Sequence, residues 1–221
     1  MDPRPRTASA GSGETLIAIV NYESARTQEI RDAFAGIDVD ADIVASIDRV
    51  DRASRIVLPP AASLARAIRA VRDAGIIPSL MRAIDQGRPL LGIGHGLHLL
   101  FDVSYEEGQH TGLGVIPGKV TGFDFAGHPV GRSTRVPHQG WSQVTWLNGC
   151  PLFAGLKSGQ EFYFDHAYHA EPLDHRLVAA TCSHGIDFSA AVWNGPVFGV
   201  QFLPEKSGEA GLQLLKNFAS L

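Results

Sequence analysis

The stretch that most constrains the fold of this chain is residues 89–101, which read PLLGIGHGLHLLF. An apolar run is followed by three glycines at alternate positions and then by apolar residues at helical spacing, so we expect a buried strand, a sharp turn and a helix. In strand–turn–helix sites of this kind, the apex carries a nucleophilic Ser or Cys in a strained backbone conformation. Here the apex residue is Gly94, which has no side chain with which to attack a substrate.

Short apolar runs and helical patterns alternate over the first hundred residues. Strands are expected at 15–20, 42–45 and 55–58, and helices at 24–34, 64–72 and 77–86. This alternation predicts a parallel, doubly wound sheet whose site lies beyond the carboxyl ends of the strands, where Gly94 falls. Later in the chain the pattern predicts strands at 118–125, 142–146, 161–169, 177–182, 188–193 and 197–202, and a last helix at 207–218 capped by Ser207.

Residues 92–101 resemble a family signature, Gly-Ile-Cys-Leu-Gly-Met-Gln-Leu-Leu-Phe. It belongs to the glutamine amidotransferase subunit of imidazole glycerol phosphate synthase, a class I, triad-type amidotransferase. Three further blocks match in the same order, at 112–120, 136–141 and 198–212. The resemblance implies a class I amidotransferase domain over residues 14–221, with a flavodoxin-like, doubly wound, mostly parallel sheet and an antiparallel extension. Residues 1–13, rich in Pro, Gly, Ser and Ala, are expected to form a disordered leader.

The resemblance places the family's catalytic residues on positions where most are replaced. A glutaminase needs a thiolate, a His that takes and returns a proton, and a carboxylate that orients the His. The family's Cys falls on Gly94 and its His on Leu203, whereas its carboxylate is retained as Glu205. We therefore expect a glutaminase-inactive chain, in which Glu205 is a surface or helix-start carboxylate.

The positions that would bind glutamine are altered as well. Pro60 lies in the segment that in the family reads Pro-Gly-Val-Gly and helps to form the oxyanion hole, and proline has no N–H to donate. Ala62, in the same segment, disfavours a positive φ. The family's Gln, four residues after the Cys, falls on His98, whereas Glu106 is expected to keep a carboxylate that faces the substrate.

A partner protein is the function that the resemblance favours. Trp141, Tyr168 and Lys206 match family segments that lie toward the (βα)8-barrel synthase subunit, and aromatic residues and cations are typical interface anchors. The chain is thus expected to act as a non-catalytic partner of such a subunit. Trp141 is equally compatible with a core position, and its exposure decides between the two.

Two other functions remain open. His95 and His98 lie three residues apart at a helix start, so a repurposed enzyme could use them as acid–base residues or, with His138, His166 or His169, as metal ligands. Nine histidines make chance clustering easy, and no triad has a known metal-ligand spacing, so neither a metal nor another cofactor is predicted. The third possibility is a stand-alone binder of a small molecule.

Composition excludes several classes of partner. The net charge of −4 gives no basic surface for nucleic acid, and no apolar run is long enough to span a membrane. The N-terminus lacks the apolar core of a signal peptide. Cys150 and Cys182 form neither a disulfide framework nor a metal-ligand pattern, so we expect two reduced thiols in a cytoplasmic protein.

Overall fold

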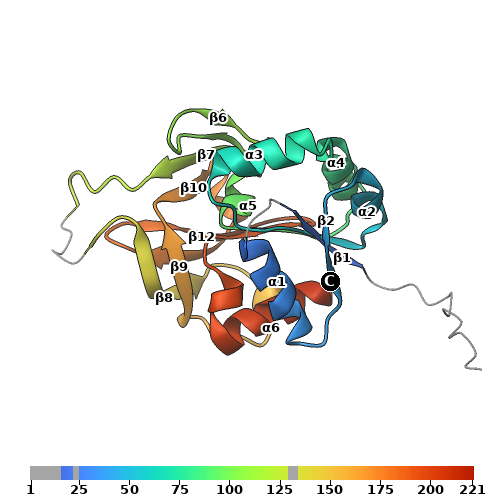
Figure 1. Ribbon diagram of the computed structural model, residues 1–221. Helices are drawn as coiled ribbons and strands as arrows, with labels where there is room; N and C mark the ends of the chain where they lie inside the picture. Colours follow the sequence, from blue (N-terminus) through green and yellow to red (C-terminus); the bar gives the residue numbers. More distant parts are fainter. Residues whose placement is uncertain (1–15, 22–24, 129–133) are drawn as a thin grey trace, which may run out of the picture.

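A computed structural model describes residues 16–21, 25–128 and 134–221 of the chain (Figure 1). The leader expected at 1–13 lies outside these residues. No helix in the described part is long and apolar enough to cross a membrane.

A nine-stranded sheet forms the centre of the molecule, in the order β2-β1-β3-β4-β13-β12-β11-β8-β9. Its first five strands are parallel to one another: β2 (Ala41–Val44), β1 (Ile17–Val20), β3 (Arg55–Leu58), β4 (Leu90–Ile93) and β13 (Val197–Val200). The other four continue the sheet in antiparallel pairs: β12 (Asp187–Asn194), β11 (Val178–Ser183), β8 (His138–Trp146) and β9 (Gln160–His166). The predicted fold class, a doubly wound parallel sheet with an antiparallel extension, is confirmed.

Helices cover both faces of the parallel half. On one face lie α1 (Ala25–Ala35) and α6 (Gly208–Ala219), and on the other α3 (Leu64–Asp73) and α4 (Ile77–Asp85), with α2 (Ile47–Arg52) near the sheet's edge (Figure 1). Alternate residues of one strand therefore enter different cores. Ile17 and Ile19 belong to the core under α1 and α6, whereas Ala18 and Val20 belong to the core under α3 and α4. Burial on both faces explains why β1 is a continuous apolar run.

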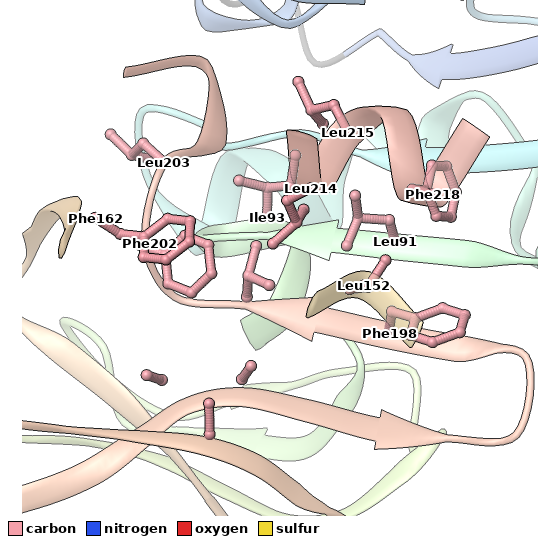
Figure 2. Close-up of a cluster of buried hydrophobic side chains, with 14 of the residues drawn as sticks. Leu91, Ile93, Leu152, Phe162, Phe198, Phe202, Leu203, Leu214, Leu215 and Phe218 are labelled. Carbon is pink, nitrogen blue, oxygen red and sulfur yellow. The ribbon is translucent and has the colours of Figure 1, made fainter. Parts of the chain in front are cut away.

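The core under α6 reaches the candidate site. Figure 2 shows Leu214, Leu215 and Phe218 of α6 over Leu91 and Ile93 of β4. Leu203 lies at one end of the same cluster, on the chain that leads from β13 to the short 3₁₀ helix η3 (Pro204–Lys206) (Figure 2). Two further 3₁₀ helices are η1 (Pro151–Phe153) and η2 (His175–Leu177).

A second, four-stranded sheet was only partly predicted. Its order is β10 (Tyr168–Pro172), β7 (Ile116–Gly122), β5 (Phe101–Ser104) and β6 (His110–Thr111). The strand expected at 161–169 is wrong, because the chain passes at Ala167 from β9 in the large sheet to β10 in the small one.

The helix expected after the glycine-rich turn is also wrong in length. It is the four-residue α5 (His95–His98), and Phe101 already belongs to β5. The carbonyl groups of Leu99 and Leu100 accept hydrogen bonds from the N–H groups of Leu113 and Val115, at 2.8 and 2.9 Å, rather than from a following helical turn. Tertiary pairing therefore overrides the helical spacing of the apolar residues.

Candidate functional site

The turn between β4 and α5 has the backbone of a nucleophile elbow. Gly94, at its apex, has φ 55° and ψ −112°, and its N–H donates to the carbonyl of Val200 at 2.9 Å. A residue with a side chain would store about 1–3 kcal/mol of strain in this conformation. The strained turn expected from the sequence is present, and glycine relieves its strain.

Close packing explains two of the glycines around the apex. A Cβ on Gly96 would lie 1.9 Å from the carbonyl oxygen of Leu58, and one on Gly92 would lie 2.6 Å from that of Gly96. Gly94 differs, because its nearest neighbours would be Pro60 Cβ at 3.6 Å and Leu203 Cδ2 at 3.9 Å. The two positions at which the family carries its nucleophile and base are therefore adjacent in space.

A pocket of about 320 Å³ opens beside Gly94, beyond the carboxyl ends of β3, β4 and β13 as the fold predicts. Most of the candidate site residues line it, from segments far apart in the sequence. They are Pro60, Gly94, His95, His98, Glu106, Tyr168 and Leu203, joined by Gln201 and His166.

Glu106, from the loop after β5, places a carboxylate in this pocket. Its Oε1 accepts a hydrogen bond from the N–H of Leu64 at 2.9 Å and lies 3.3 Å from His95 Nε2, and its Oε2 lies 3.8 Å from His98 Nδ1. Burial raises the pKa of this carboxyl, but the nearby imidazoles of His95 and His98 and the N–H of Leu64 outweigh that effect and hold the pKa well below its usual range. Glu106 is therefore an anion.

His98 is a buried histidine with one strong polar partner. Its Nε2 lies 2.9 Å from Oε1 of Gln201, a pocket residue that the sequence analysis missed. Burial lowers the pKa of His98, against smaller opposing effects of Glu106 and Gln201, so its ring is neutral. The only sequence signal for Gln201 is its place directly after β13, at the same sheet edge as Gly94.

The position of the family's base is apolar. Leu203 is 2% exposed within the core cluster, and its N–H donates to the carbonyl of Tyr163 at 2.9 Å. It offers no group that accepts or donates a proton in the pocket.

The expectation that Glu205 is a surface carboxylate is wrong, although it does lie at a helix start, in η3. Both of its carboxylate oxygens are buried, and neither has a hydrogen-bond partner among the described residues. Burial raises the pKa of this carboxyl to about 7, against smaller opposing effects of its own backbone N–H, Arg26 and Lys206. The chain thus keeps a carboxylate whose imidazole partner in the family is replaced by leucine.

The segment before α3 lacks the features of an oxyanion turn. Pro60 is buried against the apex, and Ala62 does not adopt a positive φ. Further along, Ser63 caps α3 by accepting from the N–H of Arg66 at 3.4 Å, and the N–H of Leu64 is taken by Glu106.

Ser207 does not cap α6 with its side chain as expected. Its hydroxyl donates to the carbonyl of Leu203 at 2.7 Å and accepts from the N–H of Tyr163 at 3.0 Å. It therefore ties η3 to β9.

Comparisons with known proteins identify the family. The family model described as glutamine amidotransferase class-I matches residues 18–220. This chain belongs to the class-I glutamine amidotransferase family. It is 37% identical to the imidazole glycerol phosphate synthase subunit HisH of Syntrophotalea carbinolica, over 93% of this chain and 100% of that one. The HisH subunit of Geobacter sulfurreducens is also 37% identical, over 94% of this chain and 99% of that one.

The solved structure of PurLQS from Thermotoga maritima has the same fold, with a TM-score of 0.71 at 19% identity over 94% of this chain and 98% of that one. The HisH relatives place this amidotransferase chain in the HisH family.

His138, His166 and His169 do not complete a metal-binding group with His95 and His98 in the described chain, although His166 lines the same pocket. His138 Nδ1 lies 3.0 Å from His166 Nε2, and His166 Nδ1 lies 2.9 Å from the carbonyl oxygen of Tyr168. His169 packs against Phe123, with the ring centroids 4.9 Å apart. Glu106, rather than any of these three histidines, is the third group beside His95 and His98 in the described chain.

Neither cysteine has the features of a catalytic nucleophile. Cys150 and Cys182 are buried and unbonded to each other, as expected. Burial raises the pKa of Cys150 to about 11 and that of Cys182 to about 12, so both thiols stay protonated.

The expected interface residues occupy two different settings. Trp141, on β8, is 53% exposed and meets the ring of Tyr163 edge-on at 6.0 Å, so the core alternative for Trp141 is wrong. Lys206 is exposed and lies 3.6 Å from Glu29. Tyr168 is half-buried in the pocket wall, where its hydroxyl oxygen accepts from the N–H of Glu107 at 3.3 Å.

Proposed function

We propose that this chain is a glutaminase-inactive HisH-family subunit that acts as a non-catalytic partner of a (βα)8-barrel synthase subunit. One observation carries the loss of activity: the elbow keeps its strained backbone, but glycine stands at its apex and the alkyl side chain of Leu203 stands beside it. A thiol-based glutaminase needs a nucleophile and a base within hydrogen-bond reach of each other. Neither group is supplied at these two positions.

Retention of a partner is supported by the exposed face around Trp141. The relatives are named as subunits of a synthase. The sequence resemblance implies that the segment carrying Trp141 lies toward the barrel subunit. Trp141 leaves more than half of its surface exposed, and Trp is one of the residue types most enriched among the side chains that dominate binding at interfaces. In this proposal residues 14–221 form one domain. The domain acts in the cytoplasm, a reducing compartment in which its buried thiols stay reduced.

Two cations near this face are paired with carboxylates. Lys206 pairs with Glu29, and Arg26 pairs with Asp165 at 2.7 Å. These cations are locally neutralised, so the apolar surface of Trp141 rather than net positive charge supplies the binding energy in this proposal.

Trp141→Ala is expected to weaken binding to the barrel-synthase homologue of the same organism by about thirtyfold, because truncating a central aromatic anchor commonly costs about 2 kcal/mol. Titration calorimetry measures the affinity, and circular dichroism checks that the fold is intact. Leu173→Ala is the matched control, since Leu173 is also exposed but lies at the end of β10, outside this face. Equal weakening by both variants, or unfolding of the Trp141 variant, would contradict the partner proposal.

A further inference from the structure

Three side chains with metal-binding atoms converge at the floor of the pocket. They are the imidazoles of His95 and His98 on α5 and the carboxylate of Glu106 after β5. Their potential ligand atoms all lie within 4.8 Å of one another. Glu106 is 6% exposed and His98 is 3% exposed, so two of the three groups are removed from bulk water.

The hydrogen bonds around His98 leave a pair of buried acceptors facing each other. The structure orients the Gln201 amide with Oε1 toward His98 Nε2; in this orientation the oxygen accepts, so the imidazole proton is on Nε2 and a lone pair is on Nδ1. That lone pair faces Glu106 Oε2 at 3.8 Å, and neither atom has a hydrogen-bond partner among the described residues. Two unpartnered acceptors in a buried site are unfavourable, and a cation between them would satisfy both.

The other carboxylate oxygen of Glu106, Oε1, is held in place by the backbone. Its Oε1 accepts from the N–H of Leu64 at 2.9 Å, which orients Oε2 toward His98. Gln201 orients His98 in the same way from the other side. Metal-binding histidines commonly donate their second ring N–H to an oxygen acceptor, which fixes the ring and its tautomer. His98 and Gln201 already have this arrangement.

We propose that His95 Nε2, His98 Nδ1 and Glu106 Oε2 bind a divalent transition-metal ion in the pocket beside Gly94. Two imidazoles and one carboxylate suit Zn²⁺ and related first-row ions. In a tetrahedral zinc site the ligand atoms lie about 3.4 Å apart, so side-chain adjustments of about 1 Å bring the three groups into place.

Three protein ligands leave at least one coordination position open. This position faces the pocket of about 320 Å³ beside Gly94, where a water molecule or a polar ligand has room to bind the metal. The proposal depends neither on a partner subunit nor on the absence of glutaminase activity.

The test is a titration of the untagged, chelator-treated full chain with Zn²⁺ in a calorimeter. One equivalent is expected to bind per chain. The same protein with Co²⁺ is expected to show visible d–d absorption bands of a site with nitrogen and oxygen ligands.

Removing one ligand by Glu106→Gln or His95→Ala is expected to weaken metal binding on the order of 100-fold or more. Removing the orienting acceptor by Gln201→Leu is expected to weaken it about 10–100-fold.

His175→Ala is the matched control, because it removes an exposed imidazole far from the pocket and is expected to leave the affinity unchanged. Circular dichroism of each variant shows whether the fold persists, and His95→Ala changes a side chain that is already 26% exposed. Absence of saturable one-to-one binding would overturn the proposal. Affinity that is unaffected by both Glu106→Gln and His95→Ala would also overturn it, since other histidines would then bind the metal.

Discussion

Glutamine hydrolysis by the purified chain is expected to be undetectable, both alone and with a barrel subunit present. Loss of the nucleophile or the base of a catalytic triad costs about a millionfold in turnover, and here glycine and leucine stand at both positions. Release of glutamate from glutamine, followed with a coupled assay, checks this. Enzymes commonly turn over about 1–1000 times per second. Turnover at about a thousandth of such a rate, if it disappears when His98 or Cys182 is changed, would show that another group has taken over the reaction.

Restoring the two lost groups together, as Gly94→Cys with Leu203→His, is expected to leave the chain far below full activity. The oxyanion turn is still interrupted by Pro60, and loss of one oxyanion donor costs about 100–1000-fold in turnover. A side chain at the apex also stores about 1–3 kcal/mol of strain. An imidazole at position 203 would enter an apolar cluster that disfavours its charged form.

Adding Pro60→Gly to this double variant is expected to raise turnover further, because glycine supplies an N–H and tolerates a positive φ. The comparison of double and triple variants in the same glutamate-release assay isolates the contribution of the turn. Full activity in the double variant would show that the turn functions with proline.

Glu205→Gln is expected to raise the free energy of unfolding by about 3 kcal/mol at pH 8 and to leave it nearly unchanged below pH 4. The pKa of this carboxyl is about 7 in the folded chain against an ordinary value of 4.5, so between these pH values the folded state holds a proton that the unfolded state has released. Stability therefore falls as pH rises from about 4.5 to about 7. At 1.36 kcal/mol per pKa unit, the difference corresponds to about 3 kcal/mol.

Urea unfolding of both proteins between pH 4 and pH 8 measures this effect. Glu209→Gln is the control, because Glu209 is exposed in the adjacent first turn of α6 and its change is expected to stay within about 0.5 kcal/mol. Destabilisation by Glu205→Gln at pH 8 would show that the carboxylate has a favourable partner. Arg26 and Lys206 are the cations near enough to supply one.

The architecture follows from local patterns that are visible in the sequence. Residues 17–20 form a strand buried on both faces, and their unbroken apolar run gives that information directly. No pattern in the sequence marks where α5 ends. Its end is decided by hydrogen bonds from Leu113 and Val115, which are distant in sequence from the carbonyls that they bind.

In the candidate site too, features that follow from sequence patterns were predicted, and features that depend on contacts between distant segments were not. The family pattern pairs Gly94 with Leu203, and the two positions are adjacent in space. The position of Glu106 between two histidines depends on the path of β5 and the loop after it, which no spacing in the sequence encodes. Burial of the Glu205 oxygens likewise depends on how η3 packs against the rest of the chain. The sequence predicts that Glu205 lies at a helix start, but this position alone does not decide whether the side chain is exposed or buried.

The packing of Gly96 against the carbonyl of Leu58 bears on the evolutionary history of the chain. Because backbone contacts on either side determine the shape of the elbow, that shape survives when the reactive atom is lost. Glycine at the apex stabilises the folded chain relative to a residue with a side chain, since glycine adopts φ 55° without strain. A thiol-bearing residue at the apex would bring back the backbone strain, and this cost in stability would come before any gain in activity. Under the proposed loss of glutaminase activity, reversal is thus harder than the loss itself, and the pocket remains a preformed cavity.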